Sequence, residues 1–259
     1  NGLSAYLKDD RPTQFRSGGH RADPPEVSLA RFKTQFRKMG VTRLAEITGL
    51  DRIGIPVAQA IRPMSRGLSV NQGKGLTRAD ALVSAAGEAV ERWHGEQDLP
   101  RVANAAVHEM SGRVEVLDPQ HLSPAQGTEA GTENVPVAWL TGTELLSGAP
   151  ILVPLDCVST DYTAPSEVPG LTRCSDGLAT GNTLAEALAA ALAEVIERDA
   201  VAVFTALDPG AQTRRRVARR SGWSAPTATL MDRLSDAGLW LDLWDITGPE
   251  AIPCFYAAL

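Results

Sequence analysis

Two segments of the chain decide its fold: TRADALVSAAGEAVER at Thr77–Arg92 and TLAEALAAALAEVIER at Thr183–Arg198. They are offset by 106 positions, from Thr77 to Thr183, and half of their positions are identical. Each reads as a helix that begins after a threonine N-cap, and each follows a glycine at the same distance, Gly75 or Gly181. Self-similarity at one offset predicts two pseudo-symmetric halves that present equivalent helix faces to a shared cleft.

Acidic side chains repeat on both predicted helices. They are Asp80, Glu88 and Glu91 on the first helix and Glu186, Glu194 and Glu197 on the second. At about 100° per residue, each set of three falls within an arc of roughly 80°. Because like charges on one stripe repel, we expect a cation to bind there, and Mg²⁺ prefers carboxylates and usually arrives with phosphates. The alternative is ordinary ion pairs on two solvated helices, with Arg92 and Arg198 as the partners.

The remaining sequence predicts short strands around the two helices, and hence an α+β fold. A polar arm (1–23) precedes a helix capped by Asp23 and stopped by Gly40. The other expected elements are strand pairs at 41–48 and 53–61, 135–140 and 149–158, and 240–246 and 252–258, and a helix at 228–237. We interpret residues 1–259 as one domain, with the internal repeat at 65–95 and 171–207.

Composition excludes several classes of protein. The chain has 259 residues with 25 basic and 31 acidic side chains, a net charge of −6, so it has no electrostatic reason to bind nucleic acid generally. No uncharged apolar run approaches the roughly 18 residues of a membrane span. The three cysteines and four histidines show no metal-site or disulfide spacing. A cytoplasmic location is the default expectation.

Two further motifs leave alternatives open. The stretch GLSVNQGKG at Gly67–Gly75 is similar to a Walker loop, but it is one residue too long and Lys74 precedes glycine. Lys74 is therefore either a solvated lysine or a contact to phosphate or peptide. The arginines of 214–220 favour a solvated linker within a loop (208–228), with contact to an acidic peptide as the alternative.

At this point the motifs resemble those of the YcaO superfamily. They are S-x₃-E-x₂-E-R at Ser84–Arg92 and N-x₃-E-x₇-E-x₂-E-R-D at Asn182–Asp199. The stretch RPMSRGLSVNQGKG at Arg62–Gly75 is most similar to stand-alone members that are often partnered with TfuA-type proteins. The resemblance covers nearly the whole chain, and it implies the YcaO-like fold.

The resemblance also implies a set of site residues with ATP and Mg²⁺ as cofactors. Its metal-binding acids match Glu88, Glu91, Glu194 and Glu197. Its nucleotide-binding positions match Asn182 and Glu186, with weaker matches at Arg21 and Ser28. Arg198 matches a phosphate-binding arginine with a catalytic role, and Lys74 is a further candidate for the phosphates.

The activity implied by the resemblance is ATP-dependent activation of a backbone amide in a ribosomally made precursor peptide. The product would be a thioamide, an azoline formed by cyclodehydration, or an amidine. Expected partners are the precursor peptide, a TfuA-type or leader-binding protein and a second copy of the chain. A non-catalytic nucleotide- or peptide-binding scaffold is the alternative.

This sequence departs from the family pattern at two points. Gly87 stands where some members have an arginine before the first acid, so that phosphate contact is either missing or supplied by Lys74. The C-terminal family segment, with its QxxR motif and proline-rich tail, is absent from residues 1–259.

Overall fold

The computed structural model describes residues 11–16, 19–110, 112, 114–117, 134–166, 168, 171, 173–218 and 223–259. Both repeated segments are long helices, α4 (Arg78–Gly95) and α6 (Leu184–Thr205), as predicted. Thr77 caps α4 by accepting a hydrogen bond from the Asp80 N–H, and Thr183 caps α6 by accepting one from the Glu186 N–H. None of the described helices has both the length and the apolar character needed to cross a bilayer.

The start of each long helix packs closely against the glycine that precedes it. A Cβ atom on Gly75 would lie 2.8 Å from the Ala81 nitrogen, and one on Gly181 would lie 2.3 Å from the Ala187 nitrogen. Ala81 and Ala187 are again 106 positions apart. The repeat therefore extends from the sequence to the local geometry of the two helix starts.

Three antiparallel strands cover one face of α4: β3 (Arg43–Glu46), β4 (Val57–Ile61) and β5 (Val70–Lys74), in the order β3-β4-β5. The strand pair predicted at 41–48 and 53–61 is confirmed, with the short 3₁₀ turn η1 (Thr48–Leu50) in its connection. Small residues allow the close approach, since the packed core is made entirely of alanines with no exposure: Ala58, Ala60, Ala81, Ala85 and Ala89.

Strand β5 was not expected in the glycine-bearing segment 65–76. Its sequence does not alternate apolar with polar residues, because Gly73 occupies the face towards α4 where a side chain would collide. A Cβ atom there would lie 2.1 Å from the Ala85 nitrogen. Residues 70–74 of the Walker-like stretch form a strand, which excludes a phosphate-binding loop of that type.

The N-terminal prediction needs two corrections. The expected helix up to Gly40 is two helices, α2 (Pro25–Lys33) and α3 (Phe36–Met39), with Gly40 in the left-handed conformation at φ 70°. Asp23 is not the cap, because its carboxylate is paired with Arg11 and Arg31. The arm also contains a small hairpin, β1 (Gln14–Arg16) and β2 (Gly19–Arg21).

A second sheet precedes α6, in the order β6-β8-β9-β7. It consists of β6 (Ala103–Ala105), β7 (Glu115–Val116), β8 (Val137–Thr143) and β9 (Pro150–Pro154), with the short α5 (Val107–Met110) after β6 and η3 (Leu155–Cys157) after β9. The predicted pair β8 and β9 is antiparallel, whereas β7 joins β9 in parallel. Trp139 and Val137 are buried at its centre.

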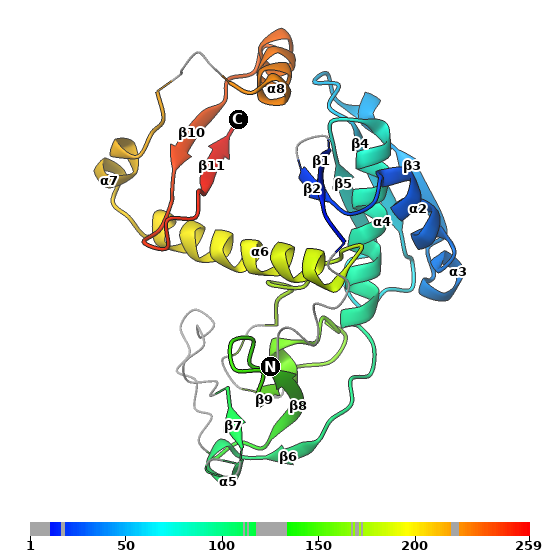
Figure 1. Cartoon of the computed structure of the whole chain (residues 1–259), viewed down its shortest axis with the longest axis vertical. Coiled ribbons are helices and arrows are strands. Elements are labelled where there is room, and N and C mark those ends of the chain that lie inside the picture. The colour runs from blue at the N-terminus through cyan, green and yellow to red at the C-terminus, as the bar shows by residue number, and fades with distance from the viewer. Residues whose placement is uncertain are drawn as a thin grey trace.

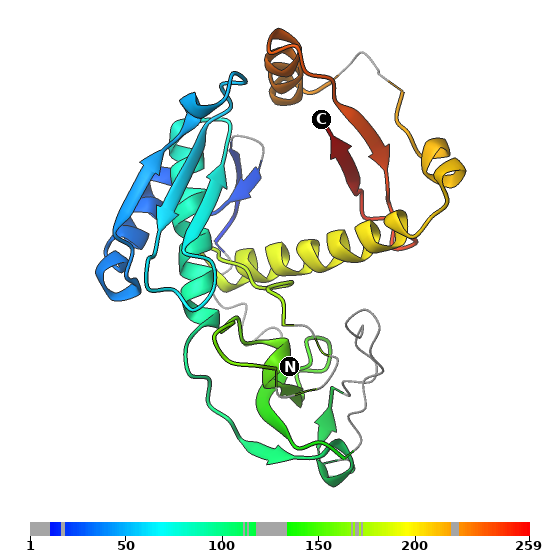
Figure 2. The ribbon, with the colours of Figure 1, turned by 180° about the vertical axis from the view of Figure 1, so that it is seen from behind.

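The C-terminal part lies at the far end of α6, which extends across the molecule from α4 (Figures 1 and 2). The predicted hairpin is β10 (Asp242–Asp245) with β11 (Phe255–Ala258), and it packs on Ala200 and Phe204 of α6. The predicted helix is α8 (Ala225–Asp236). The prediction of a solvated basic linker within a loop (208–228) is only partly confirmed. This segment contains α7 (Pro209–Arg214), and Arg216 pairs with Asp242. Arg219 and Arg220 lie outside the described residues.

Candidate functional site

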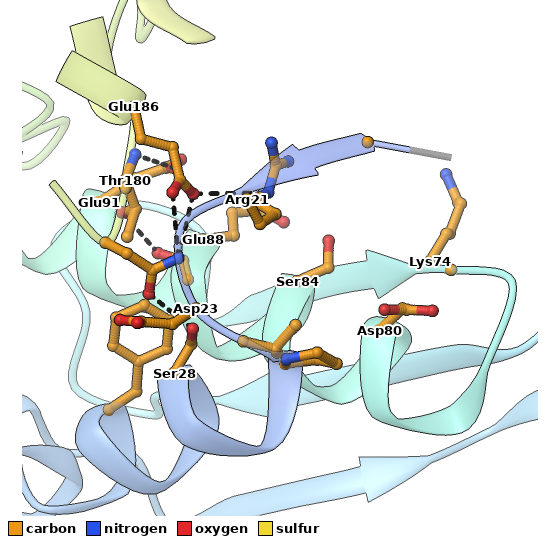
Figure 3. Close-up of a pocket in the computed structure, with 18 of the residues that line it drawn as sticks. Arg21, Asp23, Ser28, Lys74, Asp80, Ser84, Glu88, Glu91, Thr180 and Glu186 are labelled. Carbon is orange, nitrogen blue, oxygen red and sulfur yellow. Dashed lines mark hydrogen bonds and ion pairs between the residues drawn. The ribbon is translucent and has the colours of Figure 1, made fainter. Parts of the chain in front are cut away.

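A cavity of about 590 Å³ lies where α4, the start of α6 and the N-terminal segment meet. Nine of the ten predicted site residues line it: Arg21, Ser28, Lys74, Glu88, Glu91, Asn182, Glu186, Glu194 and Arg198. In Figure 3, Lys74 and Asp80 lie at one end of the cavity and Glu186 and Thr180 at the other. Glu197 is not among the lining residues, and its side chain is 55% exposed.

The α4 wall is an acidic stripe with helical spacing, as the periodicity predicts: Asp80, Glu88 and Glu91 all line the cavity. Glu88 accepts a hydrogen bond of 3.0 Å from the backbone N–H of Gln72 on β5, and Arg92 lies 3.7 Å from its other oxygen. The sheet that packs on α4 thus also fixes the orientation of this carboxylate.

Glu91 is the most electrostatically perturbed carboxylate of the cavity. Burial is the largest cause that raises its pKa to about 7, with smaller contributions from the charges of Glu88 and Glu194, against hydrogen bonds from Thr180 that lower it. The backbone N–H of Thr180 donates to Glu91 Oε1 at 2.7 Å. A cation placed between these carboxylates would favour their ionised forms.

On the α6 side, Arg198 holds the acids of its own helix. Its guanidinium lies 3.1 Å from Glu194 and 3.2 Å from Glu197, and it also pairs with Asp176 at 3.3 Å. Arg198 is half-exposed, so these pairs are of the weak, solvated kind. They leave the guanidinium available to exchange a carboxylate for a phosphate.

Glu186 and Asn182 join the N-terminal segment to α6. Both carboxylate oxygens of Glu186 accept from the Asn182 amide, at 3.2 and 3.1 Å, and one accepts from the Ala22 N–H at 3.0 Å. Arg21 lies 3.5 Å from the same carboxylate, and Ser28 donates to Asn182 Oδ1 at 2.6 Å. The structure therefore brings the two weaker matches, Arg21 and Ser28, into contact with the stronger ones.

Sequence reasoning did not select three residues that shape this cavity, Thr180, Phe32 and Arg16. Phe32 lies on α2, and Arg16 lies in the hairpin β1–β2, which the sequence does not predict. Thr180 carried a usable signal, because it immediately precedes the repeated glycine Gly181 and corresponds to Lys74 in the first copy.

The donor set fits a magnesium–nucleotide complex better than a metal held by protein alone. Among the described residues, no three His, Cys, Asp or Glu side chains are grouped closely enough to hold a metal ion by themselves. Mg²⁺ usually takes one or two protein carboxylates together with phosphates and water, so a preformed cluster is not required. The cavity offers those carboxylates, with Arg198, Lys74 and Arg21 as cations for the phosphates.

The fold and site together define an α+β protein in which two repeated carboxylate-bearing helices line one polar cleft. The family model described as YcaO cyclodehydratase, ATP- and Mg²⁺-binding, matches residues 72–259. The chain therefore belongs to the YcaO family.

Known proteins agree with this assignment. The chain is 36% identical over 240 residues to an uncharacterised protein in the tfuA 3′ region of Rhizobium leguminosarum bv. trifolii. The aligned region covers 92% of this chain and 56% of that relative. The chain thus spans about half the length of that relative.

Solved structures share the fold. YcaO from Methanopyrus kandleri, bound with AMPPCP and Mg²⁺, superposes with a TM-score of 0.65 at 22% identity, over 96% of this chain and 65% of that one. A heterocyclase in complex with substrate and cofactor gives a TM-score of 0.76 at 24% identity, over 95% and 36% of the two chains.

Proposed function

We propose that this protein binds ATP with Mg²⁺ in the cavity and activates a backbone amide of a ribosomally made precursor peptide. One observation carries the proposal: in a member of the YcaO family, carboxylates from both repeated helices and Arg198 line the same cavity. The Methanopyrus YcaO bound with AMPPCP and Mg²⁺ supports the choice of cofactor.

The residues divide by charge. Glu88, Glu91 and Glu194 would hold the metal, and Glu197 would join them once its ion pair with Arg198 opens. Arg198, Lys74 and Arg21 would hold phosphate oxygens, while Ser28, Asn182 and Glu186 would orient the rest of the nucleotide. When bound, ATP supplies the phosphoryl group that makes the amide oxygen a good leaving group.

The heterocyclase in complex with substrate supports a peptide as the second substrate, and the tfuA-region relative supports a TfuA-type partner. That partner favours a thioamide as the product, while the family's description as a cyclodehydratase favours an azoline. An amidine is the third possibility, and dimerisation and a cytoplasmic location stay predictions.

The test is ATP hydrolysis with and without a candidate precursor peptide, followed by mass spectrometry of the peptide. We expect turnover that requires the peptide and is lost in Arg198→Ala, with Glu250→Gln, outside the cavity, as the matched control. Loss of water from the peptide would indicate an azoline or an amidine formed within the peptide, which fragmentation distinguishes by the residue that is modified, and exchange of oxygen for sulfur would identify a thioamide. Nucleotide binding without turnover, with a candidate precursor peptide and a TfuA-type protein both present, would favour the scaffold alternative.

A further inference from the structure

Thr180 makes two hydrogen bonds across the boundary between the two halves. Its backbone N–H donates to Glu91 Oε1 at 2.7 Å, and its hydroxyl donates to the carbonyl oxygen of Gly87 at 3.1 Å. Gly87 and Glu91 are one turn apart on α4, whereas Thr180 belongs to the loop before α6. Figure 3 shows Thr180 and Glu91 joined in this way at one end of the cavity.

The position of Thr180 is fixed by the two residues that follow it. Gly181 packs against the first turn of α6, where a Cβ atom would lie 2.3 Å from the Ala187 nitrogen. Asn182 bonds Ser28 of α2 and Glu186 of α6. Three consecutive residues thus attach to α4, α6 and the N-terminal segment in turn.

The hydroxyl of Thr180 lowers the pKa of Glu91, as the N–H does, and in addition it bonds the carbonyl oxygen of Gly87. The N–H contacts the Glu91 carboxylate directly. It keeps its direction towards Oε1 only if the loop that carries Thr180 is fixed relative to α4. The hydroxyl provides that restraint, because it bonds a carbonyl on the same helix one turn before Glu91. Both groups would then act on one carboxylate: both favour its ionised form, and the hydroxyl also holds the loop in position.

We propose that Thr180 is a positioning residue that holds the Glu91 carboxylate in the orientation that binds the metal of a magnesium–nucleotide complex. This inference rests on the proposed function of the cavity. Thr180 itself contacts neither nucleotide nor metal in this account, so its removal weakens the contribution of Mg²⁺ to nucleotide affinity and leaves metal-free affinity unchanged.

The test measures AMPPCP affinity by calorimetry over a series of MgCl₂ concentrations, in the full chain. Thr180→Val removes the hydroxyl and keeps the shape, while Thr180→Ser keeps the hydroxyl. Mg²⁺ should raise the affinity of wild type for AMPPCP, and in Thr180→Val this increase should be about three- to tenfold smaller, which is the effect of losing one hydrogen bond. In Thr180→Ser the increase should be the same as in wild type. Thr229→Val, which removes a similar hydroxyl-to-carbonyl bond on α8, is the matched control.

A double-mutant cycle with Glu91→Gln separates positioning from a general effect on folding. If Thr180 acts through Glu91, Thr180→Val has no further effect on Mg²⁺ dependence in the Glu91→Gln background. An unchanged Mg²⁺ dependence in Thr180→Val, or an equal loss in both backgrounds, would overturn the inference. Should Thr180→Val not fold, Thr180→Ala removes the same hydroxyl and is judged by the same criteria. A wild type that does not bind AMPPCP with Mg²⁺ overturns the proposed function as well.

Discussion

The negative charge of Glu194 on α6 disfavours ionisation of Glu91 on α4, across the cavity that both side chains line. Burial is the larger cause and, together with Glu88, these effects raise the pKa of Glu91 to about 7. The two repeated helices therefore meet at a point of stored electrostatic repulsion, which a bound cation would relieve.

Glu91 should make stability depend on pH. Its pKa rises from an ordinary 4.5 to about 7 on folding, so the folded state binds more protons than the unfolded state between these values. The free energy of unfolding therefore falls as pH rises from about 4.5 to 7, by at most about 3 kcal/mol. Urea denaturation of wild type and Glu91→Gln without Mg²⁺ checks this. In Glu91→Gln the free energy of unfolding should fall less between pH 4.5 and 7 than in wild type. An equal dependence on pH in the two proteins would contradict the prediction.

A buried ion pair holds the three-stranded sheet to the end of α4. Arg62 and Glu96 each expose only 3% of their side chains and bond through two contacts, at 3.2 and 2.7 Å. Because Glu96→Gln leaves the arginine charge uncompensated, we expect a loss of about 3–5 kcal/mol in the free energy of unfolding. Chemical denaturation measures it, with the exposed pair of Arg78 and Glu46 as the control: Glu46→Gln should cost much less than Glu96→Gln, because solvent screens that pair.

The glycines beside the helices are steric requirements. Gly73→Ala would place a Cβ atom 2.1 Å from the Ala85 nitrogen, and Gly181→Ala would place one 2.3 Å from the Ala187 nitrogen. Each should cost more than about 2 kcal/mol, since backbone atoms must move. Gly49→Ala, with nothing within 4 Å, is the matched control and should be nearly neutral. Thermal unfolding measures these effects, and equal melting temperatures for the three variants would contradict this packing.

The sequence predicted those parts of the fold that depend on local signals. The two long helices have strong periodicity and threonine caps, and their acidic stripes placed Glu88, Glu91 and Glu194 correctly at one cavity. Strand β5 was missed because Gly73 serves a tertiary contact with α4 and breaks the strand pattern.

The site was predicted less completely where it depends on contacts between distant segments. Thr180 reaches α4 from 89 residues away through a backbone N–H, and its place before the repeated Gly181 marks the position in the sequence but not this contact. Glu197 has the same helical register as Glu91, but it is not among the residues that line the cavity, and its half-exposed side chain pairs with Arg198. Its assignment as a metal ligand stays a prediction.

Titration calorimetry of AMPPCP with Mg²⁺ tests the central claim most directly, in wild type, Glu194→Gln and the control Glu250→Gln. We predict micromolar affinity for wild type and the control, about −7 to −8 kcal/mol, and at least about tenfold weaker binding for Glu194→Gln. Absence of binding in wild type, or equal affinity in wild type and Glu194→Gln, would contradict a magnesium–nucleotide site on the repeated helices.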